Sequence, residues 1–299
     1  MTIGAVNAIP DGYKNSTQVV MSSFSSWGPT DDGRIKPDVV ANGVGLLSAN
    51  STADNAYATS SGTSMAAPNT SGSLLLLQEH YNKLTGSFMR ASTLKGLAIH
   101  TTDEAGTTPG PDYRFGWGLL NIRKAATIIT NRNSTSRIIE DSLLQSATKT
   151  INVIASGTGP IVATLSWTDP PGSVDLINVL NNRTPKLVND LDIEINFGAA
   201  IIKPWKLDPL NPANAATKGD NIVDNVEKIE INNPLPGESY TITIRHKGTL
   251  RNNKQIYSLI LSGAGGIAYC PSGPVSSANS RIDNFTFSGI NNTDRKSVV

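Results

Sequence analysis

The amino-acid sequence predicts two structural parts, a mixed α/β part followed by an all-β sandwich or jelly roll. The chain has 299 residues, and dividing by about 150 residues per domain suggests two domains. Patterns typical of helices occur only before about Arg132, whereas the later segments alternate apolar and polar residues as strands do. We therefore expect an α/β part at 1–132, a β part at 133–264, and a linker with the start of a further β module at 265–299.

The composition fits a folded protein and excludes several classes of function. Hydrophobic residues make up 38% of the chain, which is enough for a sizeable core. The 25 Lys and Arg residues balance 24 Asp and Glu residues, so no basic surface for nucleic acid or anionic lipid is expected. The longest apolar run, 74–77, is far too short to span a membrane. The single cysteine, Cys270, excludes an intrachain disulfide framework and a multi-cysteine zinc site.

The first part is expected to begin on a short apolar strand at 1–6. Two further strand candidates, 19–21 and 38–41, are separated by a segment rich in turn-forming residues. Apolar residues at helical spacing then predict helices at 64–84, 91–101 and 121–129.

The second part is expected to consist of strands separated by clusters of Pro, Gly and Asn. A joint rich in Gly, Ala and Ser follows at 262–278, and a new strand pattern begins at 282–287. The first residues carry no signal-peptide pattern, and we interpret the sequence as an internal segment of a longer protein. The expected strands of the second part are 150–155, 161–167, 191–197, 226–231, 240–246 and 257–261.

Residues 60–68, Ser-Ser-Gly-Thr-Ser-Met-Ala-Ala-Pro, form the sharpest local motif. Ser64 falls in the first turn of a predicted helix, where unpaired amides and the positive end of the helix dipole favour a developing oxyanion. Gly62 permits a close backbone approach, and Ala66 and Ala67 permit close packing of the helix. Taken alone, such a serine is either an acyl-transfer nucleophile or an ordinary capping residue. Ala66 stands where the nucleophile elbow of α/β-hydrolases has glycine, which disfavours an esterase.

The motifs around Ser64 favour the nucleophile. Residues 24–29 (Phe-Ser-Ser-Trp-Gly-Pro), 32–41 (Asp-Gly-Arg-Ile-Lys-Pro-Asp-Val-Val-Ala) and 62–68, in this order and spacing, resemble the carboxyl-terminal half of subtilisin-like serine peptidases. Residues 115–121 (Phe-Gly-Trp-Gly-Leu-Leu-Asn) resemble the segment that closes that domain. The resemblance covers roughly the first 130 residues. It implies part of a doubly wound α/β sheet, with Ser64 as the nucleophile and its own amide as half of the oxyanion hole.

The resemblance has two departures near the predicted site. Asn42 replaces a usual proline, and Asn69-Thr70 replaces a usual apolar or His-Val pair. In this family the catalytic Asp and His and the oxyanion Asn precede the serine, so we expect them upstream of this chain. His80, sixteen residues along the same helix, is expected about 24 Å from Ser64. A serine without a base is a weak nucleophile, so the chain alone is expected to be inactive.

An acidic pattern occurs in the second part. Asp190, Asp192 and Glu194 alternate with apolar residues and are expected to share one face of a strand. Because like charges repel, a hard cation such as Ca²⁺, a nearby Lys or Arg, or solvation is expected to balance them. Glu227 alternates with Ile229 and Ile231, so it is expected to point towards the core and to need a partner.

With 167–171 and 236–240, these acidic segments resemble the jelly-roll domain that follows the catalytic domain in some secreted subtilisin-like proteases. That resemblance implies a structural Ca²⁺ site, and no cofactor is expected for catalysis. The candidate ligands are Asp190, Asp192, Asp220 and Asp224.

Two hypotheses of function follow. The first is a fragment of a secreted, subtilisin-like serine endopeptidase that hydrolyses proteins or peptides. The alternative is a non-catalytic binding or stabilising module whose peptidase part is an inert remnant. Neither hypothesis includes a nucleic-acid partner or a membrane span.

Overall fold

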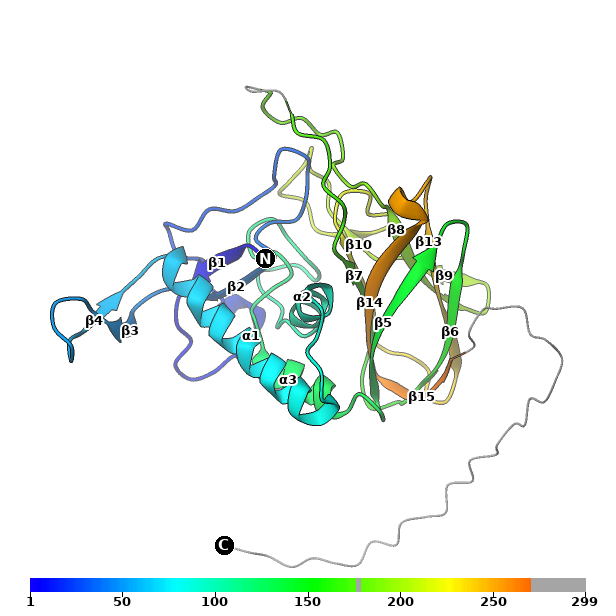
Figure 1. Ribbon diagram of the computed structural model, residues 1–299, viewed down its shortest axis with the longest axis horizontal. Helices are drawn as coiled ribbons and strands as arrows, with labels where there is room; N and C mark the ends of the chain where they lie inside the picture. Colours follow the sequence, from blue (N-terminus) through cyan, green and yellow to red (C-terminus); the bar gives the residue numbers. More distant parts are fainter. Residues whose placement is uncertain (176–178, 270–299) are drawn as a thin grey trace, which may run out of the picture.

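The structure of this chain is a computed structural model, and it describes residues 1–175 and 179–269 (Figure 1). All α-helices of the described residues precede residue 131, and two large antiparallel sheets follow them. The periodicity of apolar residues predicted each α-helix to within one residue at either end. The helices are α1 (Thr63–Thr85), α2 (Ala91–His100) and α3 (Ile122–Thr130), with short 3-10 turns at Ser16–Gln18 and Arg251–Asn253.

The first part also contains a small parallel sheet and a hairpin. β1 (Ile3–Val6) pairs in parallel with β2 (Val39–Asn42), so the strands expected at 1–6 and 38–41 are confirmed. The antiparallel hairpin, β3 (Leu46–Ala49) and β4 (Tyr57–Ser60), projects from the body of the protein and leads into α1 (Figure 1). The sequence did not predict this hairpin.

The second part consists of two facing antiparallel sheets. One has the strand order β12-β7-β14-β5, and the other has the order β15-β6-β13-β8-β9. A minor pair, β10 (Trp205–Lys206) and β11 (Thr217–Lys218), lies in the connection before β12. The strands of the two sheets are β5 (Ser136–Leu144), β6 (Lys149–Ala155), β7 (Ile161–Trp167), β8 (Leu191–Phe197), β9 (Ala200–Ile202), β12 (Val226–Ile231), β13 (Ser239–His246), β14 (Lys254–Ser262) and β15 (Ala264–Tyr269).

The largest hydrophobic core lies between these two sheets. Buried side chains of both sheets, including Leu165, Trp167, Ile193 and Ile242, form one continuous cluster. Every residue of β7 is buried, because one face of this strand packs on the opposite sheet and the other face packs on α2. The sheet that contains β7 is therefore covered on both sides.

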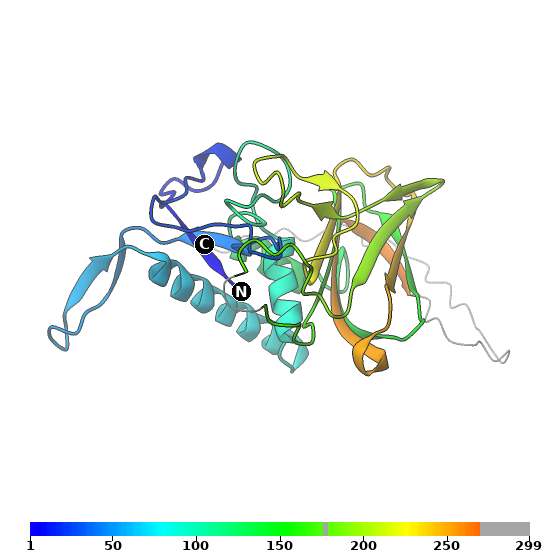
Figure 2. The ribbon, with the colours of Figure 1, turned by 90° about the horizontal axis from the view of Figure 1, so that it is seen from above.

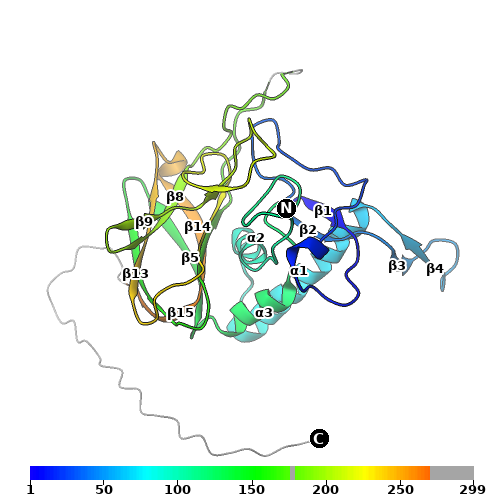
Figure 3. The ribbon, with the colours of Figure 1, turned by 180° about the vertical axis from the view of Figure 1, so that it is seen from behind.

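Helix α2 joins the two parts (Figures 1 and 3). It packs on β7 and β14, and the closest approach is at Gly96, where an added Cβ would lie 2.8 Å from Ile260 Cδ1 and 3.0 Å from Ser166 Cβ. Ile260 belongs to the same buried cluster as Leu97 of α2 and Ala125 of α3. The helices and the second part thus share a core, and Figure 2 shows α2 between the small sheet and the two large ones.

Several expectations about strands were wrong or incomplete. Residues 19–21 form no strand, and Met21 makes only an isolated bridge to Val6. The expected joint at 262–278 contains β15, which pairs with β6. Strand β5 was not predicted, because its sequence, Ser-Arg-Ile-Ile-Glu-Asp-Ser-Leu-Leu, does not alternate regularly. The strand pattern at 282–287 and Cys270 lie outside the described residues.

None of the helices in the described part of the chain combines the length and the apolar character that a membrane crossing needs.

Candidate active site and acidic cluster

Ser64 is the second residue of α1, and its side chain is exposed. Helix α1 is 23 residues long and has no acidic residue in its first turn. The amide of Met65 donates a hydrogen bond to Gly62 O at 3.0 Å, so the amides of Thr63 and Ser64 precede the first intrahelical bonds. An anion at this end of the helix would meet free N–H donors and the positive end of the dipole.

The start of α1 is held close to β1 and β2 by small residues. Gly62 N–H donates to Gly43 O at 2.8 Å. A Cβ at Gly43 would lie 2.6 Å from Ala5 Cβ and 2.8 Å from Gly62 O, so only glycine fits there. Ala66 is fully buried against Ala5 and Ala41, as its size suggested. Ala67, by contrast, is exposed.

The two departures from the family pattern contact each other. The side-chain amide of Asn69 on α1 donates to the main-chain carbonyl of Asn42 at 3.3 Å. The side-chain oxygen of Asn42 in turn accepts from Val44 N–H at 3.0 Å. Asn42 and Asn69 therefore link the end of β2 to the first turns of α1, beside the helix end that carries Ser64.

Each of the three histidines makes its contacts away from Ser64. His80 Nε2 lies 3.0 Å from Thr130 Oγ1 on α3. His100 is buried between Thr164 and Ser262, each at 2.9 Å from a ring nitrogen, and burial lowers its pKa to about 3. His246 Nε2 accepts from Ser146 N–H at 2.8 Å. Within residues 1–175 and 179–269, no imidazole is hydrogen-bonded to the Ser64 hydroxyl.

Three of the four predicted metal ligands come together around one lysine. The Lys247 ammonium nitrogen lies 3.2 Å from Asp190 Oδ2, 2.9 Å from Asp192 Oδ1 and 2.5 Å from Asp220 Oδ1. Asp190 precedes β8, Asp192 lies on it, and Asp220 comes from the connection before β12. Lys247 follows the last residue of β13. These four residues, with Glu227, are called the acidic cluster below.

Glu227 is the member that the ligand prediction missed. It is fully buried, and its Oε2 accepts from Ile193 N–H of the opposite sheet at 2.7 Å. One carboxylate oxygen each from Asp192, Asp220 and Glu227 lie within 4.8 Å of one another. The sequence did carry a signal for Glu227, because its alternation with Ile229 and Ile231 turned it towards the core.

The carboxylates of the acidic cluster are only partly satisfied. Asp190 Oδ1, Asp192 Oδ2 and Glu227 Oε1 are buried and have no hydrogen-bond partner. Burial raises the pKa of Asp190, of Asp192 and, most strongly, of Glu227. Despite partial burial, the surrounding carboxylates raise the pKa of Lys247, which keeps its ammonium group charged.

Glu194, the third acidic residue expected on the strand, is paired outside the cluster. Arg245 Nη1 donates to Glu194 Oε1 at 2.9 Å, and Arg245 Nε lies 3.9 Å from Asp192 Oδ2. The expected counter-charges in this region are therefore Lys247 and Arg245.

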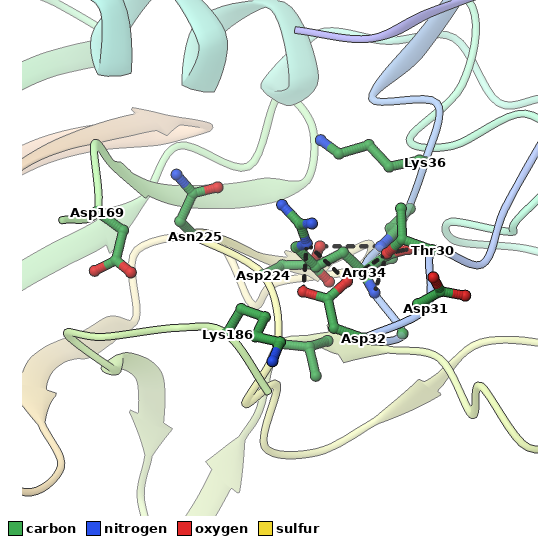
Figure 4. A network of polar contacts seen from close by, with 12 residues as sticks. Thr30, Asp31, Asp32, Arg34, Lys36, Asp169, Lys186, Asp224 and Asn225 are labelled. Carbon is green, nitrogen blue, oxygen red and sulfur yellow. Dashed lines mark hydrogen bonds and ion pairs between the residues drawn. The ribbon is translucent and has the colours of Figure 1, made fainter. Parts of the chain in front are cut away.

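Asp224, the fourth predicted ligand, belongs to a different network at the junction of the two parts (Figure 4). Its Oδ1 accepts from Ile35 N–H at 3.0 Å and its Oδ2 accepts from Asn221 at 3.1 Å. Burial raises the pKa of Asp224 to about 6. In the same network Arg34 pairs with Asp32 at 2.7 Å. The role of Asp224 is thus to hold the loop around Ile35 against the second part.

Comparison with known proteins shows that the first part is similar to subtilases. Residues 1–118 match the Peptidase_S8 family model, which describes the subtilase family. The C5a peptidase of Streptococcus pyogenes serotype M18 (strain MGAS8232) is 49% identical over 75 residues, which cover 25% of this chain and 6% of that protein. The serine protease/ABC transporter B family protein tagB of Dictyostelium discoideum is 30% identical over an alignment of 299 positions, and the alignment covers 75% of this chain and 15% of that protein.

Solved structures give weaker similarity. The PatG macrocyclase in complex with peptide is 24% identical, with a TM-score of 0.32, over 42% of this chain and 35% of that one. Tripeptidyl peptidase 2 is 11% identical, with a TM-score of 0.29, over 87% of this chain and 29% of that one. The sequence comparisons support a subtilisin-like peptidase segment at residues 1–118. The chain spans 6% and 15% of the length of the two relatives named above.

Proposed function

We propose that this chain is part of a subtilisin-like serine endopeptidase in which Ser64 attacks the carbonyl carbon of a peptide bond. The observation that carries this proposal is an exposed hydroxyl at the start of a long helix, within the segment that matches the subtilase family. The alternative chemistry, an esterase with a nucleophile elbow, gains no support from the buried Ala66 or from the family match.

The proposed reaction is acyl transfer. Ser64 Oγ forms a bond to the carbonyl carbon while its proton passes to a general base, and the carbonyl oxygen becomes an oxyanion. The Ser64 amide is placed to donate to that oxyanion, because it has no partner within the helix. The acyl-enzyme then forms when the leaving amine takes the proton, and water releases the acid product.

The base for Ser64 is proposed to come from outside these 299 residues. The hydrogen bonds of His80, His100 and His246 support this, since each holds its imidazole at another part of the fold. The catalytic His and Asp and a side-chain donor to the oxyanion would then belong to another segment, and this chain alone would not turn over peptides.

Activity of the longer protein tests the proposal. We expect Ser64→Ala to lower kcat for a peptide substrate by about 10³-fold or more, because it removes the nucleophile. Ser71→Ala, an exposed serine on the same helix, is the matched control and should retain activity. If the wild-type protein is folded and hydrolyses no peptide, the alternative of a non-catalytic binding or stabilising module replaces this proposal.

We further propose that the second part is a jelly roll and that the protein is secreted. The strand order supports the first point, because successive strands β5, β6, β7 and β8 alternate between the two sheets, as do β12, β13 and β14. Secretion rests on the resemblance of the acidic segments to the domain that follows the catalytic domain in some secreted subtilisin-like proteases, and detection of the protein in culture medium tests it.

We also propose that the acidic cluster binds a structural Ca²⁺ ion. Carboxylate oxygens are the ligands that Ca²⁺ prefers, and the buried oxygens without partners on Asp190, Asp192 and Glu227 fit such an ion. Asp220 completes the set, and Asp224 is no longer a candidate because it lies in the network at the junction.

Calorimetric titration tests the Ca²⁺ site. We expect binding heat and a rise in melting temperature for the wild type, both lost in Asp192→Asn, whereas Asp54→Asn on the exposed hairpin turn retains them. A wild-type titration with neither heat nor a shift in melting temperature would remove the site.

A further inference from the structure

The position of Lys247 is set by the fold rather than by its side chain alone. Lys247 N–H donates to the main-chain carbonyl of Asp190 at 2.8 Å, which fixes the start of the lysine side chain beside the acidic cluster. From there the ammonium group reaches Asp190, Asp192 and Asp220, each within 3.2 Å. The ammonium group therefore balances negative charge from carboxylates at the place where three segments of the second part meet.

A single ammonium group does not satisfy the acidic cluster. An ammonium has three N–H donors, and contacts to three carboxylates use all of them. Glu227 is fully buried, and one of its carboxylate oxygens lies within 4.8 Å of carboxylate oxygens of Asp192 and Asp220. Its Oε1 accepts no hydrogen bond from Lys247. A divalent cation that binds six to eight oxygens would use the oxygens that the lysine leaves without partners.

The lysine and a divalent cation compete for the same position. Two positive centres within about 4 Å of each other repel strongly in a partly buried site. Lys247 has an exposed fraction of 38% and a flexible four-carbon stem, so its ammonium group has a path to solvent. Arg245 is held by Glu194 and stays outside the centre of the cluster.

We propose that Lys247 is an internal counter-ion of the acidic cluster, and that Ca²⁺ binds by displacing its ammonium group towards solvent. This inference rests on the proposed Ca²⁺ site. It gives the lysine two effects: it holds the cluster together when no cation is bound, and it lowers the affinity of the site for the cation.

Calcium titrations of matched lysine variants test the displacement. We expect Lys247→Met to bind Ca²⁺ about tenfold more tightly than the wild type, a difference of about 1.4 kcal/mol. Lys247→Arg keeps the positive charge and should gain no affinity. The control Lys254→Met removes an exposed lysine of β14 and should behave as the wild type. Without Ca²⁺, Lys247→Met should melt at a lower temperature than the wild type.

A second measurement uses the wild-type protein and needs no variant to fold. Reductive methylation followed by mass spectrometry reports how accessible each lysine is. We expect Ca²⁺ to increase the methylation rate of Lys247 several-fold and to leave Lys254 unchanged.

The outcomes separate the two proposals. If the wild type and Lys247→Met bind Ca²⁺ with equal affinity, or if Ca²⁺ leaves the methylation rate of Lys247 unchanged while binding heat is observed, displacement is wrong and the Ca²⁺ site stands. If neither protein binds Ca²⁺, the site itself is wrong and the displacement falls with it.

Discussion

At the scale of single residues, His100 shows how the junction of the two parts depends on protonation. Its ring is buried, with hydrogen bonds to Thr164 and Ser262. Burial lowers its pKa, Lys228 nearby lowers it further, and Glu230 opposes both effects. Because the folded pKa is about 3 and the ordinary value is 6.5, the unfolded chain binds a proton in this range and the folded chain does not.

The sign of the pH effect follows from that difference. The contribution of His100 to stability is fully present above pH 6.5 and is lost as the pH falls towards 3. At pH 5 we expect the free energy of unfolding of the wild type to have fallen by about 2 kcal/mol more than that of His100→Gln, because glutamine does not titrate. Urea unfolding of both proteins at pH 7.5 and pH 5 checks this. Parallel changes in the two proteins would contradict it.

Residue-level prediction from sequence succeeded where the local pattern decides the position of a side chain. The position of Ser64 in the first turn of α1 follows from the helical pattern, and the inward direction of Glu227 follows from strand alternation. The sequence did not predict that Asp224 lies apart from Asp190, because a loop whose path has no sequence pattern brings Asp224 to Ile35. The pairing of Asn42 with Asn69 likewise depends on how β2 and α1 meet in space.

At the scale of elements, the packing of α2 on the second part depends on Gly96. A Cβ at this position would approach both Ile260 and Ser166. A Cβ at Gly72 on α1, by contrast, would meet no atom within 4 Å. Replacing either glycine with alanine favours the helical conformation by about 1 kcal/mol. The two substitutions therefore differ only in how the added methyl group packs.

We expect opposite signs for these two substitutions. Gly72→Ala should stabilise the protein by about 0.5–1 kcal/mol. Gly96→Ala should destabilise it, since overpacking costs about 1–3 kcal/mol. Chemical denaturation of the two variants measures both values. Stabilisation by Gly96→Ala would mean that α2 packs less tightly than described.

Prediction of elements from sequence was accurate for long periodic segments and poor for short or irregular ones. The three helices and the strands β6, β7, β8, β12 and β13 were located from periodicity alone. The hairpin of β3 and β4 was not predicted, because its strands have only four residues each and its apolar side chains Leu47 and Tyr57 face solvent. The packing of α2 on the second part was not predicted, because beside the apolar contact of Leu97 with Ile260 it uses serine, threonine, histidine and glycine, which give no apolar pattern.

At the scale of the whole molecule, apolar side chains stand exposed on the structure that carries Ser64. Leu75 and Leu76 on α1 are 70% and 61% exposed, and Leu47 and Tyr57 on the hairpin are 71% and 70% exposed. Exposed apolar groups that lie together on one surface are typical of protein–protein contacts. This agrees with the proposal that residues outside this chain complete the site around Ser64.

The rate at which a fluorophosphonate probe labels Ser64 tests most directly whether residues outside this chain complete the site. A base activates the serine for attack on such a probe, so we expect slow labelling of this chain and fast, stoichiometric labelling of the longer protein, in both cases lost in Ser64→Ala. Fast labelling of Ser64 in the isolated chain would contradict the account, because a base would then be present within these 299 residues. Slow labelling of Ser64 in a folded longer protein would equally contradict its role as the nucleophile.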